Sequence, residues 1–254
     1  MDLFLYGTLR SDALRRAVAG CDLSGVPAVL DGWACEGVAG EVVPLIRAVP
    51  GARAPGLLLR DVPETALARL DVYELPWGYD RRALRVEGPD GPVEAGVYLP
   101  PADYATTAAP WDLDGWQRTH EAASVLAAEE LFARDPRPPA DELRRMWPMM
   151  GRRAWSRLRR QADVSPATLR HDPAPGDWDL AADGPPAGRF FALQPLTIRH
   201  RRFDGGDSGA LSREVFVGIE AALVLPYDPV SDRVLLVEQI RVPRGVKPNA
   251  LPSH

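Results

Sequence analysis

The chain has 254 residues, of which 46% are hydrophobic and 26% charged, and its formal net charge at pH 7 is -5. This is the balance of an ordinary globular protein, long enough for one large domain or two small ones. The acidic excess argues against a general nucleic-acid-binding role, which needs a basic surface. No apolar run approaches the ~20 residues that a membrane-spanning helix requires.

Location and redox state are also constrained by the sequence. Asp2 follows the first methionine, and the apolar run at residues 3–6 is too short for a signal peptide. Cys21 and Cys35 are expected to be small apolar core residues in a reducing compartment. The four histidines show no zinc-type spacing with them. We therefore expect a cytoplasmic protein that binds no nucleic acid, no membrane and no structural metal.

Residues 1–105 are predicted to form a mixed α/β domain, because short strands bounded by Gly and Pro alternate with helices. Strands are expected at residues 3–6, 56–59, 83–86 and 94–99. Helices are expected at residues 11–19 and 63–70, the second with Pro63 near its first turn.

Residues 106–171 are predicted to be a helical connector, with helices at 114–134 and 141–160 joined by a proline-rich stretch. Pro148 is expected to kink the second helix or divide it in two, because it lacks a backbone donor and clashes with the preceding turn. This helix is rich in arginine, at positions Arg144, Arg145, Arg152, Arg153, Arg157, Arg159 and Arg160. The arginines suit an anion site or, more commonly, a solvated helix face.

Residues 172–187 are predicted to be a linker, because Pro, Gly, Asp and Ala predominate there. In residues 188–254, strands are expected at 190–202, 214–226 and 234–237, with a turn at 228–232.

Two segments of the first domain contain residues suited to a ligand site. The strand at 3–6 stops at Gly7, whose missing Cβ lets a ligand approach the backbone. The segment 70–82 places Glu74 among aromatic residues, where partial desolvation raises the pKa of a carboxyl toward neutrality. A general acid/base needs such a pKa. The alternatives are a buried strand that ends in a turn and an exposed loop whose glutamate faces water.

Taken together, these segments resemble one known family. Tyr-Gly-Thr-Leu near the N-terminus, then Asp-x-Tyr-Glu with a following Tyr-x-Arg, then a strand ending in Val97-Tyr98-Leu99 resemble the γ-glutamylcyclotransferase (AIG2-like) family over roughly residues 1–105. The branch that acts on γ-glutamyl amines and similar small substrates is the most similar. The resemblance implies a small β-barrel or sheet with helices. It also implies an enzyme that releases 5-oxoproline from a small γ-glutamyl substrate and uses no cofactor or metal.

The resemblance also implies roles for particular residues. In the reaction the substrate's α-amine attacks its own γ-carbonyl, and by resemblance Glu74 moves the protons. The residues implied to bind substrate are Tyr6, Gly7, Thr8, Leu9, Tyr79, Arg81 and Tyr98. For the last three, core or surface packing remains an alternative, and Arg81 is either a pocket cation or a surface partner of a neighbouring aspartate. Many relatives have glycine directly after the glutamate, so Leu75 is expected to alter the leaving-group side of the pocket.

Residues 188–241 resemble the opening of a Nudix hydrolase of the ADP-ribose pyrophosphatase type, which implies a truncated α/β/α segment. Such enzymes hold Mg²⁺ with glutamates that follow an Arg-Glu pair. The only Arg-Glu pair followed by an apolar residue is Arg213-Glu214, and Val217 and Gly218 stand where two glutamates are required. We therefore expect no Nudix hydrolysis from this chain, and possible homodimerisation through the uncovered strands.

Three functions are thus open: a cyclotransferase, a Nudix hydrolase represented by a fragment, and a non-catalytic binding module. The orientation of Glu74 distinguishes the first from the third, because a catalytic carboxyl must face the Tyr6–Leu9 loop. Metal dependence distinguishes the first from the second.

Overall fold

The computed structural model describes residues 1–101, 104–162, 174, 176–219 and 224–236. It divides into one unit of Met1–Ile219 and a second of Glu220–His254, each described by itself below. Within the described residues, every helix is too short or too polar to cross a membrane.

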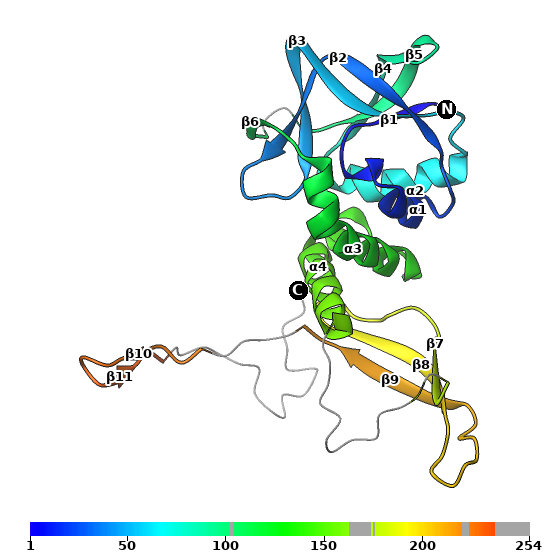
Figure 1. The fold of residues 1–254 in the computed structure, drawn as a ribbon, viewed down its shortest axis with the longest axis vertical. Helices are drawn as coiled ribbons and strands as arrows, with labels where there is room; N and C mark the ends of the chain where they lie inside the picture. Colours follow the sequence, from blue (N-terminus) through cyan, green and yellow to red (C-terminus); the bar gives the residue numbers. More distant parts are fainter. Residues whose placement is uncertain (102–103, 163–173, 175, 220–223, 237–254) are drawn as a thin grey trace, which may run out of the picture. The chain divides into compact units, whose positions relative to one another are not determined.

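The first unit begins with a closed five-stranded β-barrel (Figure 1). Its strands are β1 (Leu3–Leu5), β2 (Gly25–Val38), β3 (Pro44–Leu59), β4 (Asp80–Gly88) and β5 (Gly91–Leu99). They follow the order β3-β1-β5-β4-β2, and pairing of β2 with β3 closes the barrel. A short strand, β6 (Thr106–Pro110), pairs antiparallel with the end of β2. The mixed α/β fold class is confirmed, although the sequence reasoning missed β2, β6 and all of β3 before residue 56.

Strand β1 explains the apolar run at the start of the chain. Phe4 and Tyr6 point into the barrel core, whereas Leu3 and Leu5 pack in the cluster beneath the helices. All four side chains are buried. Because both faces of this short strand are covered, the sequence is continuously apolar instead of alternating.

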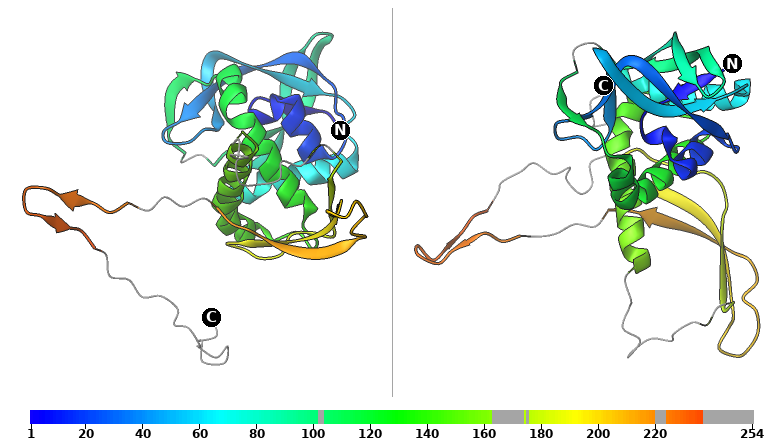
Figure 2. Two further views of the ribbon diagram at one scale, coloured as in Figure 1. Left: turned by 60° about the horizontal axis from the view of Figure 1, so that its bottom comes forward. Right: turned by 45° about the horizontal axis from the view of Figure 1, so that its top comes forward.

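Helices α1 (Asp12–Ala19) and α2 (Glu64–Glu74) lie side by side against one side of the barrel (Figure 2). Ser11 caps α1 by accepting a hydrogen bond from the Leu14 amide at 3.1 Å. Helix α2 was predicted to end at residue 70. It continues one turn further, so that Glu74 is its last residue.

Two short 3₁₀ helices flank these elements: η1 (Thr8–Arg10) follows β1, and η2 (Leu75–Trp77) follows α2. Pro76 lacks an N–H group and cannot continue α2. Gly78 then adopts a φ of +84°, a conformation that favours glycine, and turns the chain into β4. The segment that looked like a loop is therefore a helix end followed by a tight turn.

Helices α3 (Leu113–Ala133) and α4 (Ala140–Ala162) pack against each other, and α3 also packs against α1. Of the two alternatives predicted at Pro148, the division into two helices is wrong, because α4 runs through this proline as one helix. The solvated face predicted for α4 is correct for several arginines but wrong for Arg153. Its side chain is 2% exposed and is paired with Glu130 of α3.

A second sheet has the order β7-β8-β9 and consists of β7 (Trp178–Ala182), β8 (Ala192–His200) and β9 (Leu211–Val217). Strand β7 lies inside the segment predicted to be a linker, so that prediction was wrong for residues 178–182. The strand signal of these residues is weak, and they form a strand because they pair with β8. The strand expected at 214–226 ends at Val217. Its residues 220–223 lie outside the described residues.

The described part of the second unit contains a hairpin of β10 (Tyr227–Asp228) and β11 (Arg233–Val234). It encloses the turn predicted at 228–232. Position 237, the end of the strand expected there, lies outside the described residues.

The cysteine prediction is correct for only one residue. Cys35 is half-buried beside the barrel core, and burial raises the pKa of its thiol to about 11. Cys21 is exposed just after the end of α1, so its assignment to the core was wrong. A cysteine in a polar inter-element segment has no apolar neighbours to bury it.

Candidate functional site

A cavity of about 430 Å³ lies where the ends of several elements meet. It is bounded by the segment after β1, the β2–β3 connection, the end of α2 with η2, residues of β5 and the turn before β4, and helix α4. Of the eight predicted site residues, seven line it: Tyr6, Gly7, Thr8, Leu9, Glu74, Tyr79 and Tyr98. This volume falls in the range of small-molecule sites.

Glu74 is the titratable group that stands out in this cavity. Its side chain is half-buried, because one side faces the cavity while protein encloses the rest. Desolvation raises its pKa to about 7. Within the described structure, no hydrogen bond or ion pair reaches its carboxylate. A carboxyl group that is half ionised near neutral pH can both accept and donate a proton.

The Gly7–Leu9 segment supplies hydrogen-bond donors to the same cavity. Within the described structure, no hydrogen bond uses the amide N–H of Gly7, Thr8 or Leu9. The first amides of a 3₁₀ or α-helix have no partner inside that helix, and η1 starts at Thr8. Gly7 also packs tightly, because a Cβ there would lie 3.1 Å from Pro44 Cγ. Unpaired amides beside a carboxyl suit an anionic or polarised oxygen.

Three tyrosines form the wall between barrel and cavity. The Tyr6 hydroxyl donates to the Tyr98 carbonyl oxygen at 2.9 Å, and a side-chain hydrogen bond joins Tyr6 to Tyr79. Burial raises the pKa of all three phenols above the ordinary value, and the negative charge of Glu74 adds to the effect. These side chains therefore stay neutral over the physiological pH range and act as fixed hydrogen-bonding groups.

Arg81 is the one predicted site residue that does not line the cavity. Its guanidinium donates to both oxygens of Asp71, at 2.8 and 3.0 Å. Asp71 in turn accepts a hydrogen bond of 2.7 Å from the Tyr98 hydroxyl. Of the two alternatives for Arg81, the structure therefore supports the second, in which Arg81 is the partner of a neighbouring aspartate and not a cation of the pocket. The pair holds Tyr98 from behind and joins α2 to β4 and β5.

Helix α4 contributes a wall that sequence reasoning missed. Trp147 and Pro148 line the cavity, and the Trp147 ring meets those of Tyr73 and Trp77 edge-on, with centroids 5.7 and 5.5 Å apart. Arg144 also lines the cavity and donates to the Pro76 carbonyl oxygen. The only signal in the sequence was the apolar spacing within an arginine-rich helix, and that spacing does not say which distant segment it faces.

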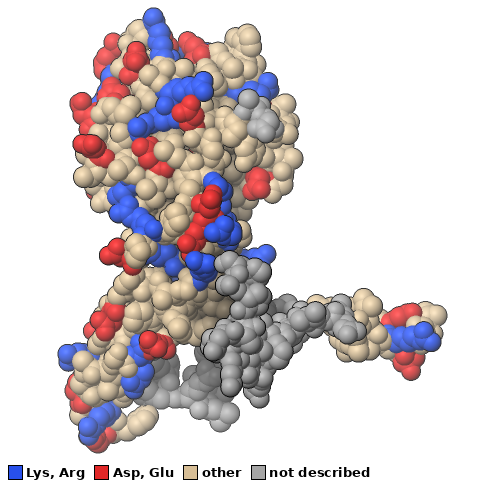
Figure 3. Space-filling model, turned by 180° about the vertical axis from the view of Figure 1, so that it is seen from behind, with Lys and Arg blue, Asp and Glu red and all other residues tan. Residues whose placement is uncertain are grey.

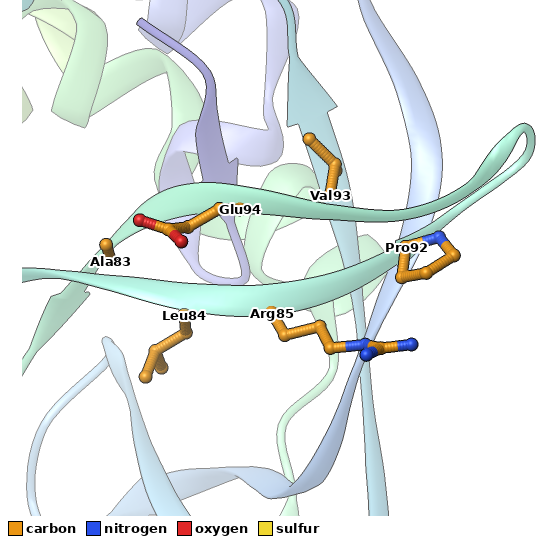
Figure 4. A pocket seen from close by; sticks show the side chains of 6 residues that line it. All are labelled: Ala83, Leu84, Arg85, Pro92, Val93 and Glu94. Atoms are coloured by element: carbon orange, nitrogen blue, oxygen red, sulfur yellow. The ribbon is translucent and has the colours of Figure 1, made fainter.

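A second depression, of about 260 Å³, lies on the β4–β5 hairpin (Figure 4). It is lined by Ala83, Leu84, Arg85, Pro92, Val93 and Glu94, all of them exposed or half-buried. The groups with the chemistry described above, Glu74 and the Gly7–Leu9 segment, line the larger cavity instead.

On the face shown in Figure 3, basic and acidic side chains are intermixed over the barrel. Within the described residues, no group of three or more His, Cys, Asp or Glu side chains is placed to hold a metal ion.

The chain is similar to two groups of known proteins. The family model "Gamma-glutamyl cyclotransferase, AIG2-like" matches residues 3–118. A solved structure of an AIG2-like protein from Mus musculus is 28% identical, covers 44% of this chain and 85% of its own, and has a TM-score of 0.30.

A short segment of the chain is similar to proteins named ADP-ribose pyrophosphatase. The Haemophilus influenzae protein is 39% identical over 61 residues, 24% of this chain and 28% of its own length. The Escherichia coli protein is 49% identical over 53 residues, 21% of this chain and 25% of its own length. The chain thus spans about a quarter of the length of the curated relatives it matches, a pattern consistent with a fusion. Both the barrel and Glu74 of helix α2 lie within the family-model match, because residues 3–118 match the gamma-glutamyl cyclotransferase, AIG2-like family.

Proposed function

We propose that the chain releases 5-oxoproline from a small γ-glutamyl substrate, with Glu74 as general acid/base. One observation carries the proposal: an unpartnered carboxyl with a pKa of about 7 shares a cavity with the unpaired amides of Gly7, Thr8 and Leu9. Family membership of residues 3–118 agrees with this chemistry.

The reaction needs little beyond positioning and proton transfer. Its nucleophile, the α-amine, and its electrophile, the γ-carbonyl, belong to one molecule, so the site has to hold the cyclic conformer. A bond forms between the α-nitrogen and the γ-carbon, and the bond from the γ-carbon to the departing nitrogen breaks. The protons that the α-ammonium loses as it becomes the lactam N–H are those that the departing amine takes up.

In this proposal Glu74 carries those protons, and the Gly7–Leu9 amides hold the substrate carboxylate or the oxyanion that forms on the γ-carbonyl. The neutral phenols of Tyr6, Tyr79 and Tyr98 orient the glutamyl group. Because the pKa of Glu74 is about 7, kcat/KM is expected to rise with pH through neutrality, as the carboxyl ionises.

The test is release of 5-oxoproline from a panel of γ-glutamyl amino acids and γ-glutamyl amines, measured with EDTA present. Glu74→Gln keeps the size and removes the carboxyl, and is expected to lower kcat by about 100- to 10,000-fold. Glu64→Gln is the matched control, because Glu64 is exposed on the first turn of the same helix. Undiminished release by the Glu74 variant would assign the proton transfer elsewhere. No release from any substrate by a folded chain would leave the binding-module alternative.

The similarity to ADP-ribose pyrophosphatases makes pyrophosphate cleavage the second candidate for the same assay. Because the chain spans about a quarter of those relatives, we propose the cyclotransferase reaction first. ADP-ribose with Mg²⁺ in a parallel reaction separates the two, since only pyrophosphate cleavage requires the metal.

A further inference from the structure

Helix α4 lies outside the residues matched by the family model, yet it forms part of the cavity. The match ends at residue 118, within α3, whereas Arg144, Trp147 and Pro148 lie in α4, the next helix along the chain. The specificity of this site therefore depends on side chains that the family domain alone does not supply.

The lining of the cavity consists of a polar group and an apolar group of residues. Glu74 and the Gly7–Leu9 amides form the polar group, which suits the charged groups of a glutamyl moiety. The remaining lining is largely apolar or aromatic: Val38, Val42, Val43, Leu45, Trp77, Tyr104, Trp147 and Pro148. If the proposed reaction is correct, the departing amine has to lie against this second set.

The other charged residues of the lining, Glu41 and Arg144, do not offer a buried counter-charge for a charged leaving amine. Arg144 is the one cationic residue of the described lining, and its guanidinium already contacts the Pro76 carbonyl oxygen and the Asp141 carboxylate. Glu41 is exposed on the β2–β3 connection, where water and salt weaken its attraction for a cation. Neither residue favours a charged leaving group over an uncharged one.

Two aromatic residues of the apolar group, Trp77 and Trp147, are held in place by their neighbours. Trp77 donates its ring N–H to the Tyr73 carbonyl oxygen at 2.9 Å, and its ring meets Trp147 edge-on. Helix α4 is anchored in turn by the buried pair of Arg153 and Glu130. Rings that keep their orientation present a preformed surface to another ring, which gains edge-to-face contacts beyond simple burial.

Building on the proposed function, we infer that the substrate is the γ-glutamyl derivative of an aromatic amine, and that Trp147 of α4 is its specificity-determining residue. The aromatic ring of the amine packs against the surface that Trp77 and Trp147 present to the cavity, while Glu74 acts on the glutamyl end. The apolar lining selects the amine, since each well-fitted apolar group of a substrate raises kcat/KM in a hydrophobic pocket by about 10- to 200-fold.

The test compares kcat/KM of the full chain for three γ-glutamyl derivatives: those of phenethylamine, methylamine and putrescine. We expect the phenethylamine derivative to be preferred over each of the others by about 10-fold or more. In Trp147→Ala the preference for phenethylamine over methylamine is expected to fall about 10-fold. Trp155→Ala is the control, because Trp155 is exposed on the same helix and contacts His120, away from the cavity.

The outcomes separate this inference from the reaction on which it rests. Release at equal efficiency from all three derivatives would overturn the inference and leave the cyclotransferase in place, as would a preference for putrescine. No release from any derivative would overturn both. If Trp147→Ala does not fold, the preference of the unmodified chain and the variant Trp77→Leu still decide the matter, since Trp77 contacts Trp147 and lines the same cavity.

Discussion

Glu74→Gln is expected to stabilise the protein at neutral and alkaline pH. Burying an ionised carboxyl without a partner costs free energy, and in the described structure Glu74 has no hydrogen bond or ion pair. Glutamine has nearly the same shape and no charge, so the exchange removes this cost without opening a cavity. Activity and stability thus respond in opposite directions to the same substitution.

The magnitude follows from the pKa. Each tenfold change in a dissociation constant corresponds to about 1.4 kcal/mol. Raising the pKa of Glu74 from 4.5 to about 7 therefore penalises the ionised folded state by about 3 kcal/mol. Since the folded pKa is above the unfolded one, this group's contribution to stability is fully present below about pH 4.5 and is lost as pH rises through about 7.

The assay is denaturant unfolding of the native chain and the variant, followed by tryptophan fluorescence between about pH 4 and 8. The variant is expected to match the native chain near pH 4 and to exceed its free energy of unfolding by about 3 kcal/mol near pH 8. Glu64→Gln is expected to show no such pH-dependent gain, because that side chain is exposed. A stability difference that stays constant over the whole range would refute the desolvation of Glu74.

The remaining predictions concern the scaffold. Arg153→Ala is expected to destabilise the chain by about 1.5–3 kcal/mol, because Glu130 keeps its pair with Arg134 but loses the one with Arg153, and the Phe190 carbonyl oxygen loses its donor. Arg157→Ala, on the exposed face of the same helix, is the control, and thermal unfolding of both variants checks the difference. Gly56→Ala is expected to cost about 1–3 kcal/mol, since the new methyl would overlap the Phe4 ring, and an unchanged unfolding midpoint would contradict this packing.

The sequence alone identified the polar and tyrosine residues that line the cavity. Glycine after an apolar strand and a glutamate among aromatic residues are local features, and local features indicate which residues have the right chemistry. The predicted residues other than Arg81 therefore line one cavity. Helix α1 was also predictable, because both of its ends are marked by residue type. Ser11 is the N-terminal cap, and Gly20 at the C-terminal end adopts the left-handed conformation that favours glycine.

The tertiary structure decided what lies opposite that chemistry. Strand β2 has no clean alternation of apolar and polar residues, since closure of the barrel exposes and buries its residues irregularly. Helix α4 looked like a solvated arginine-rich helix, and its periodicity does not reveal that Trp147 meets Trp77, 70 positions away in the chain. Even the raised pKa of Glu74 depends on this packing, because desolvation is produced by neighbours that only the folded chain brings together.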